Sequence, residues 1–270
     1  MTPVTWLYVP GDRPERFARA AASGADVVII DLEDAVAAAH KDQARTNVLD
    51  YLSTRVPGTP AVHVRVNDLR TRRGRDDLAA LVGVPGLDAL RLPKVDTAGD
   101  LDSVPGDTPV YALLESARGV AGAEAIAAHP RVAGVALGEQ DLAAELSISD
   151  DRALDHLRLR VVVAAAAAGV GPVPMSVFTT VTDTEGLRAS CAHGRALGMF
   201  GRTAIHPRQI PVIRAAFSPT PAEIAEARAV VEAAEAAGQT GVGAFVLPDG
   251  RFVDVPIVTK ARRILALADD

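Results

Sequence analysis

The stretch that decides the fold of this 270-residue chain runs from residue 110 to residue 141. It opens with the apolar run Val110-Tyr111-Ala112-Leu113-Leu114, which ends in Glu115. A segment with helical spacing follows, and a second apolar run, Val132-Ala133-Gly134-Val135-Ala136-Leu137-Gly138, leads to Asp141. Runs that are apolar on both faces are typical of parallel strands covered by helices. The stretch therefore predicts two consecutive parallel strands, each of which ends near a carboxylate.

The same alternation of strand and helix extends through most of the chain. Strands are predicted at residues 5–9, 27–32, 61–66, 89–92, 110–114, 132–137, 173–178 and 200–205. Helices are predicted between them, at residues 13–22, 41–52, 75–82, 119–128, 152–168 and 183–197. This repeat favours an α/β fold of the (β/α)8 TIM-barrel type over an open doubly wound sheet, although the pattern alone separates the two poorly. No glycine-rich dinucleotide fingerprint follows the first strand, which weakens the doubly wound alternative.

The tail of the chain departs from this repeat. We expect a TIM barrel over residues 1–217, closed by a helix at 207–217, and a C-terminal extension over 218–270 within a single functional domain. Thr220 and Glu223 have the spacing of a capping box at the start of a long helix over 220–237. Residues 242–247 and 252–255 predict a small hairpin that turns at Asp249-Gly250, and a final helix follows from Pro256. A closed barrel does not need this extension, so we expect it to pack on the barrel or on a neighbouring subunit.

Bulk composition excludes several functional classes. The net charge of -6 and the pI near 5.5 argue against a nucleic-acid-binding protein, which needs a basic face. The longest apolar stretch, residues 161–170, is about half the roughly 20 residues that a membrane-spanning helix needs, so we expect no membrane partner. The N-terminus shows no secretory signal pattern, and the single cysteine, Cys191, rules out an intramolecular disulfide. We therefore expect a cytoplasmic protein.

Polar side chains follow most of the predicted strands. They are Arg13, Asp31, Glu33, Asp34, Arg65, Asn67, Lys94, Glu115, Glu139, Gln140, Asp141 and His206. The carboxyl ends of the strands of a barrel meet on one face, where the active sites of this fold lie. There, Glu115 and Asp141 offer hard oxygen ligands for a divalent cation such as Mg²⁺. Each residue taken singly also fits a helix cap or a solvated charge, but their joint position at successive strand ends indicates a site.

At these residues the chain resembles the citrate lyase β-subunit-like branch of the HpcH/HpaI aldolase/citrate lyase family. The matching segments are Val9-Pro10-Gly11-Asp12-Arg13-Pro14-Glu15-Arg16-Phe17, Ile30-Asp31-Leu32-Glu33-Asp34-Ala35-Val36, Val64-Arg65-Val66-Asn67, Leu92-Pro93-Lys94, Leu114-Glu115-Ser116-Ala117-Arg118-Gly119, Ile205-His206-Pro207-Arg208-Gln209-Ile210 and Val253-Asp254-Val255-Pro256. They span almost the whole chain in family order. Each segment is weak alone, whereas the ordered set is specific.

The resemblance implies a Mg²⁺-dependent TIM-barrel enzyme that is a homotrimer or another homo-oligomer. By resemblance, Glu115 and Asp141 are the protein ligands of Mg²⁺, and Glu115 also lies against the substrate. Arg65 resembles the catalytic clamp on the carboxylate of an oxo acid, with Arg13 as a second substrate-binding arginine. Asp254 resembles the catalytic acid that related enzymes insert from the C-terminal lid of a neighbouring subunit.

Further residues are expected around this centre. Asp31, Glu33, Asp34 and Gln140 are expected to support the metal ligands from behind. Lys94 is expected to bind substrate. The phosphates of a CoA thioester would suit Lys94, Arg70, Arg72, Arg73 and Arg75, although residues 70–75 fit a solvated loop equally well. The chain also departs from the family: Gln140 stands where Glu is common, Met175 and Thr180 stand where relatives often have Asp, and Ala204 replaces a common Cys.

The resemblance implies three functions in order of preference. The first is a carbon–carbon lyase of retro-aldol or Claisen type that acts on a 3-hydroxyacyl-CoA such as citryl-CoA or malyl-CoA and releases acetyl-CoA and an oxo acid. The second is an aldolase for a free 2-oxo acid without CoA. The third, motivated by the substitutions at Gln140, Met175 and Thr180, is a non-catalytic binding subunit that has kept the barrel.

Overall fold

The computed structural model describes residues 2–55, 60–239, 244–247 and 249–269. The chain divides into two compact units, residues 2–217 and residues 218–270, and each is described by itself below. Within the described ranges, no helix is both long enough and apolar enough to cross a membrane.

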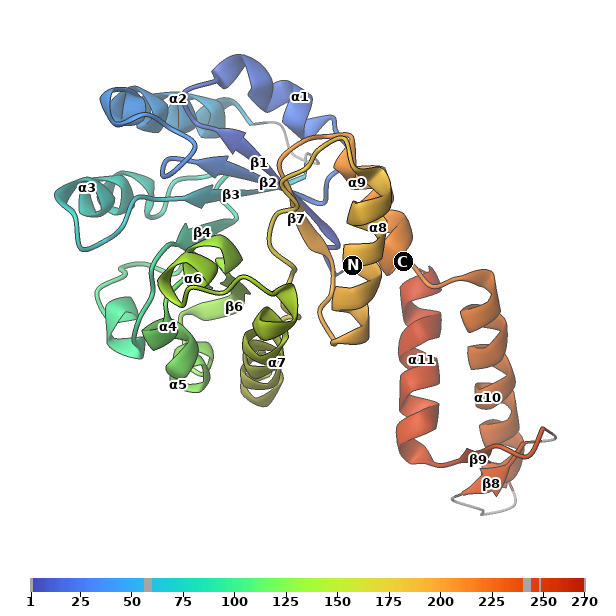
Figure 1. Ribbon diagram of the computed structural model, residues 1–270. Coiled ribbons are helices and arrows are strands. Elements are labelled where there is room, and N and C mark those ends of the chain that lie inside the picture. Colours follow the sequence, from blue (N-terminus) through green and yellow to red (C-terminus); the bar gives the residue numbers. More distant parts are fainter. Residues whose placement is uncertain (1, 56–59, 240–243, 248, 270) are drawn as a thin grey trace. The chain divides into compact units, whose positions relative to one another are not determined.

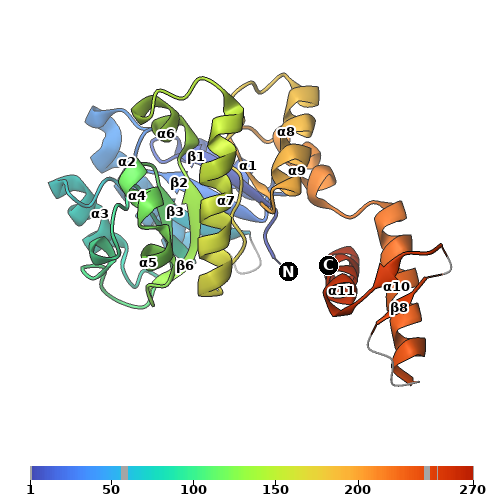
Figure 2. The ribbon, with the colours of Figure 1, turned by 60° about the horizontal axis from the view of Figure 1, so that its bottom comes forward.

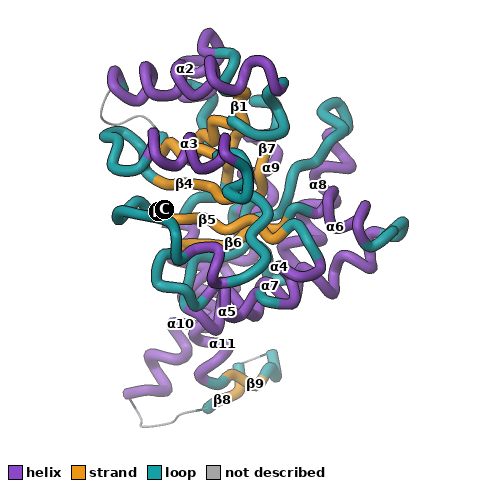
Figure 3. Tube along the Cα trace, turned by 90° about the vertical axis from the view of Figure 1, so that its left-hand side faces the viewer, coloured by secondary structure: helices purple, strands orange, loops and turns teal. Residues whose placement is uncertain are grey.

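The unit 2–217 is built on a curled, seven-stranded parallel sheet (Figures 1 and 3). Its strands are β1 (Thr5–Pro10), β2 (Val27–Asp31), β3 (Ala61–Arg65), β4 (Ala89–Leu92), β5 (Val110–Leu114), β6 (Val132–Leu137) and β7 (Arg202–Ala204). They lie in the order β6-β5-β4-β3-β2-β1-β7. Consecutive strands from β1 to β6 are therefore neighbours, which is how successive βα units of a barrel are arranged.

Helices cover the outside of this sheet. They are η1 (Pro14–Arg16), α1 (Phe17–Ala21), η2 (Ala38–His40), α2 (Lys41–Thr54), α3 (Arg72–Leu81), η3 (Ala98–Leu101), α4 (Ala117–Ala121), α5 (Ala123–Ala127), α6 (Glu139–Glu145), α7 (Asp151–Ala168), α8 (Thr184–Ala196) and α9 (Gln209–Phe217). Figure 2 shows α7 lying along β6, beside α5. The prediction of an α/β fold with a parallel sheet is confirmed, and the boundaries of β1 to β7 differ from the predicted ones by at most two residues.

The predicted strand at 173–178 is the main difference from the sequence-based expectation. In the structure this segment makes one isolated bridge, between Met175 and Arg202. Pro172 and Pro174 explain why it goes no further, because proline has no N–H to donate to a ladder and is rarely found in a central strand. Among the residues that the structure describes, no ladder joins this segment to β6. The sheet is thus a barrel-like curl with an open seam rather than a closed eight-stranded ladder.

The inner side of the sheet is unusually polar for a barrel. The register pairs Asp31 of β2 with Arg65 of β3, Arg65 with Arg91 of β4, and Arg91 with Tyr111 of β5. Barrel interiors are usually filled by branched apolar residues. Here one rung across four strands carries an acid, two arginines and a phenol. Three members of that rung, Asp31, Arg65 and Arg91, line the cavity described below.

The unit 218–270 consists of two helices joined by a hairpin. These are α10 (Pro221–Gln239), β8 (Phe245–Val246), β9 (Phe252–Val253) and α11 (Val255–Asp269), with β8 antiparallel to β9. The capping box is present, because Thr220 Oγ1 accepts from the Glu223 backbone N–H and the Glu223 carboxylate accepts from that of Thr220. The predicted hairpin residues 242 and 243 lie outside the described residues. The expectation that this unit packs on the barrel or on another subunit stays a prediction.

Candidate active site

A cavity of about 360 Å³ opens at the carboxyl ends of the strands. It is lined by residues from β1 to β7 and from the segment after Pro174, and Glu115 and Asp141 are among them. Its described acidic lining residues are Asp31, Asp34, Glu115, Glu139 and Asp141, and its arginines are Arg65 and Arg91. Acids therefore outnumber cations around this space, which is the charge balance that a bound divalent cation would correct.

Glu115 lies directly after β5, with only 7% of its surface exposed. Its Oε2 accepts a 3.1 Å hydrogen bond from the backbone N–H of Lys94. Gly138, after β6, makes room for it, because a Cβ at Gly138 would stand 2.4 Å from the Glu115 Cγ. Burial raises the pKa of Glu115 to about 8, and the nearby carboxylates of Glu33 and Asp141 add to this shift. A carboxyl with such a pKa needs a cation if it is to be ionised at neutral pH.

Asp141 reaches the same cavity from the first turn of helix α6. Its neighbour Glu139 has a different role, because its two carboxylate oxygens accept hydrogen bonds of 2.9 and 2.7 Å from Arg158 of helix α7. Glu139 thus joins α6 to α7. Its carboxylate is paired with Arg158 and cannot take the place of the Glu that is common at position 140. Gln140 itself is exposed and lines the cavity.

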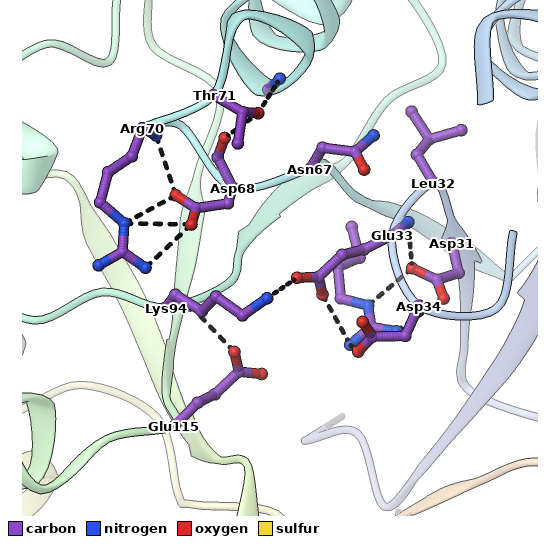
Figure 4. A network of polar contacts seen from close by, with 12 residues as sticks. Asp31, Leu32, Glu33, Asp34, Asn67, Asp68, Arg70, Thr71, Lys94 and Glu115 are labelled. Atoms are coloured by element: carbon purple, nitrogen blue, oxygen red, sulfur yellow. Dashed lines mark hydrogen bonds and ion pairs between the residues drawn. The ribbon is translucent and has the colours of Figure 1, made fainter. Parts of the chain in front are cut away.

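Lys94 links two of the acidic residues in this region (Figure 4). Its Nζ donates a 3.0 Å hydrogen bond to Glu33, while its backbone N–H bonds Glu115. Its φ of 55° lies in the left-handed region, which is sparsely populated for residues other than glycine and is often found at functional sites. Lys94 therefore contacts both acids, Glu33 through its ammonium group and Glu115 through its backbone N–H.

Arg65 is held by acids on three sides. Its Nε and Nη2 donate to the two oxygens of Asp31 at 2.7 and 2.6 Å, and its Nη1 lies 3.1 Å from Glu33 and 3.2 Å from Asp34. Asp31 is fully buried, and its side chain also accepts the backbone N–H of Glu33. The guanidinium further lies over the ring of Tyr8, 4.9 Å from its centroid. This bidentate pairing fixes the orientation of Arg65 toward the cavity.

The structure thus gathers most of the predicted site residues but not all. Glu115, Asp141, Arg65, Asp31, Asp34 and Gln140 line one cavity, and Glu33 forms an ion pair with Arg65. Arg13 does not line it; its side chain is 56% exposed and lies 4.0 Å from Asp12. Lys94 lines a neighbouring pocket with Asp68 and Arg70. Asp254 belongs to the unit 218–270, where it precedes α11.

Sequence reasoning missed three polar residues inside the barrel: Tyr8, His63 and Arg91. Arg91 sits in the strand Ala89-Leu90-Arg91-Leu92, where a charge in an otherwise apolar four-residue run is itself a signal. Its alignment with Arg65 depends on strand register, which the pattern of apolar residues does not give. Of these three, Tyr8 and Arg91 line the cavity, and His63 contacts Arg91.

The residues present fit a hard divalent cation. Among the described residues no three acidic, histidine or cysteine side chains form a ready-made metal cage. Two carboxylates, Glu115 and Asp141, nevertheless face one cavity that carries excess negative charge. Mg²⁺ commonly uses one or two protein carboxylates and completes its octahedron with water and substrate oxygens. Glu115 and Asp141 are therefore the residues that could hold it.

Comparisons with known proteins show which family the chain belongs to. The model of the HpcH/HpaI aldolase/citrate lyase family matches residues 5–207. A (3S)-malyl-CoA thioesterase of Cereibacter sphaeroides is 40% identical, covering 97% of this chain and 93% of its own length. The citrate lyase subunit beta of Leuconostoc mesenteroides subsp. cremoris is 36% identical, over 98% of this chain and 93% of that protein.

A solved structure shows the same relationship in three dimensions. The crystal structure of CitE from Mycobacterium tuberculosis, in complex with magnesium, acetoacetate and coenzyme A, superposes with a TM-score of 0.86. It is 36% identical in sequence and covers 100% of this chain and 99% of its own. Both the fold and the sequence thus place the protein in one group, and the chain belongs to the HpcH/HpaI aldolase/citrate lyase family.

Proposed function

We propose that this protein is a Mg²⁺-dependent carbon–carbon lyase that cleaves a 3-hydroxyacyl-CoA into acetyl-CoA and an oxo acid. The observation that carries the proposal is the buried carboxylate of Glu115, which shares a cavity with Asp141 and with the fixed guanidinium of Arg65. Support comes from relatives whose names include a malyl-CoA thioesterase and a citrate lyase subunit, and from a structural neighbour with magnesium and coenzyme A.

The chemistry assigns distinct tasks to the residues of the cavity. In cleavage the 3-hydroxyl loses its proton, the electron pair of the C2–C3 bond passes to the thioester α-carbon, and that carbon takes up a proton. A cation held by Glu115 and Asp141 would polarise the oxygen at the reacting carbon as a Lewis acid. Arg65 would bind the substrate carboxylate in place of the exposed Asp34, while Asp31 keeps its guanidinium oriented.

Asp254 is the proposed acid for the thioester α-carbon, delivered by the unit 218–270 of a neighbouring subunit in a homotrimer or another homo-oligomer. Mixing two inactive variants tests both parts of this idea. Asp254→Asn lacks the acid and Glu115→Gln lacks the metal ligand, so a mixed oligomer that contains both variants should regain activity at cavities with an intact Glu115 and a partner's Asp254. Full activity of Asp254→Asn alone would show that the role is wrong.

Product analysis tests the reaction itself. Purified protein with Mg²⁺ is given malyl-CoA and citryl-CoA, and acetyl-CoA, free CoA and oxo acid are measured separately. A lyase forms acetyl-CoA and oxo acid in equal amounts, and activity should be lost with EDTA and in Glu115→Gln but kept in Glu124→Gln, which changes an exposed glutamate. Free CoA with a hydroxy acid would instead mean thioester hydrolysis, the second candidate function, which the thioesterase relative favours.

The alternative of an aldolase for free 2-oxo acids is tested by binding. A ligand that binds only the native protein raises its thermal midpoint, by a free energy of about 2.7 kcal/mol at a hundred times its Kd. We expect CoA or acetyl-CoA to raise the midpoint in the presence of Mg²⁺. An unchanged midpoint at millimolar CoA, together with a rise on adding a 2-oxo acid, would favour the free-acid aldolase.

A further inference from the structure

The lining of the cavity includes an arginine that has no role in the proposed cleavage reaction. Arg91, in the middle of β4, is 1% exposed and is among the residues that line the cavity. Of the described residues, none offers it a carboxylate partner in an ion pair, and its Nη2 has no hydrogen-bond partner. A buried charge without a counter-charge is costly, and folded proteins rarely retain one without a reason.

The surroundings of Arg91 keep its charge in place without neutralising it. Its Nε donates to the Nδ1 of His63 at 3.5 Å, and its guanidinium lies 5.2 Å from the ring centroid of Tyr111. Burial, together with Arg91 itself, lowers the pKa of His63 well below its ordinary value, so His63 is a neutral acceptor. Burial also lowers the pKa of Arg91, and Arg65 nearby opposes its charge further. These contacts orient the guanidinium of Arg91, and its Nη2 can still donate a hydrogen bond to a ligand.

Arg91 differs in this respect from Arg65, which precedes it by one strand. Arg65 is balanced by the carboxylate of Asp31, with two hydrogen bonds to it, whereas the register places only the neutral Tyr111 on the other side of Arg91. The two arginines occupy one rung of the sheet, and only one of them has its counter-ion in the protein. A ligand carboxylate that enters the cavity would supply the direct counter-charge that Arg91 lacks.

We propose that Arg91 binds a second carboxylate of the substrate, so that the oxo acid released or used by this enzyme is a dicarboxylic 2-oxo acid rather than a monocarboxylic one. The inference rests on the proposed function, in which one carboxylate of the same oxo acid lies near Arg65 and the metal ligands. The second carboxylate accepts a hydrogen bond from Nη2 of Arg91 inside the cavity. Arg91 is thus a residue that determines specificity and takes no part in bond cleavage.

Matched ligand pairs test this inference without any turnover. Isothermal calorimetry with Mg²⁺ compares oxaloacetate with 2-oxobutyrate and 2-oxoglutarate with 2-oxopentanoate, so each pair differs only in the terminal carboxylate. For at least one pair, the dicarboxylate should bind the wild-type protein about tenfold more tightly or better, as expected for a hydrogen-bonded charge pair. The advantage should disappear in Arg91→Met and persist in Arg152→Met, which removes an arginine whose side chain is 85% exposed.

Thermal unfolding of the same variants separates binding from a merely structural role. Arg91→Met should raise the midpoint of the ligand-free protein, because it removes an uncompensated buried charge. A lowered midpoint with an unchanged preference for dicarboxylates would overturn the inference, as would equal affinities within both wild-type pairs. Lyase activity does not enter these measurements, so a protein that cleaves thioesters without a dicarboxylate preference refutes the role of Arg91 alone.

Discussion

Binding of Mg²⁺ to this protein should release protons, and the pKa of Glu115 determines the mean number released per ion at a given pH. Its pKa of about 8 means that at pH 7 the metal-free protein carries about 0.9 proton on this carboxyl, whereas a metal ligand must be deprotonated. Release should fall to about 0.5 proton at pH 8 and about 0.1 at pH 9. In the same way the apparent affinity for Mg²⁺ should rise about ninefold from pH 6 to pH 7 but only about twofold from pH 8 to pH 9.

Calorimetry in buffers of different ionisation enthalpy measures this release directly. The observed heat of Mg²⁺ binding at pH 7 should vary linearly with the buffer's ionisation enthalpy, with a slope near the number of protons released. Glu124→Gln should keep the slope and Glu115→Gln should abolish it, together with most of the affinity. A slope near zero at pH 7 in the wild-type protein would mean that Glu115 is already ionised, and the account of the buried acidic centre would be wrong.

The same shift makes the stability of the metal-free protein depend on pH. The pKa of Glu115 is raised from 4.5 to about 8 on folding, so the native state holds a proton that the unfolded state loses. Stability from this group is fully present below pH 4.5 and is lost as the pH rises toward 8, by at most about 5 kcal/mol. Urea unfolding of the EDTA-treated protein should show this decline, and saturating Mg²⁺ should reduce it.

Two further substitutions test the surroundings of the proposed metal ligands. Gly138→Ala would place a Cβ 2.4 Å from the Glu115 Cγ and should weaken Mg²⁺ binding at least about tenfold in calorimetry. Gly171→Ala, whose Cβ would stand 3.8 Å from the Ala133 carbonyl oxygen, should not. Glu139→Gln should lower the free energy of unfolding in urea by about 3 kcal/mol, because it breaks the buried pair with Arg158. Unchanged metal affinity in the first case, or unchanged stability in the second, would refute these assignments.

Much of the barrel could be predicted because its strands are short apolar runs with clear ends. The strand 110–114 and the strand 132–137 appear in the structure with the predicted boundaries, and Glu115 and Asp141 line one cavity as expected. The segment 173–178 was predicted as a strand from its apolar residues alone. Its prolines carried the contrary signal, since they remove the donors that a central strand needs.

Partnerships between side chains were harder to predict than positions. Glu139 looked like a neighbour of the metal site, but its bond to Arg158 depends on how α6 packs against α7. Arg65 was expected to bind substrate, but it is already paired with three acids, Asp31 at the end of β2 and Glu33 and Asp34 in the turn after it. Such pairings are set by tertiary packing and strand register, which local patterns of polarity do not contain.

The open seam beside β6 bears on how this enzyme could acquire new substrates. Met175, Ser176 and Val177, from the segment that forms a single bridge, make one wall of the cavity. An ordinary barrel strand forms hydrogen-bond ladders with a neighbouring strand on each side, and substitutions must preserve both. In the described part of the chain, this segment forms only a few backbone hydrogen bonds, with residues in and next to β7. The partly buried side chains of Ser176 and Val177 can therefore change size and polarity without disturbing Glu115 after β5 or Asp141 in α6, whereas Met175 is fully buried. This segment is therefore the part of the cavity wall where substitutions, natural or engineered, are expected to change ligand specificity with the least effect on the sheet.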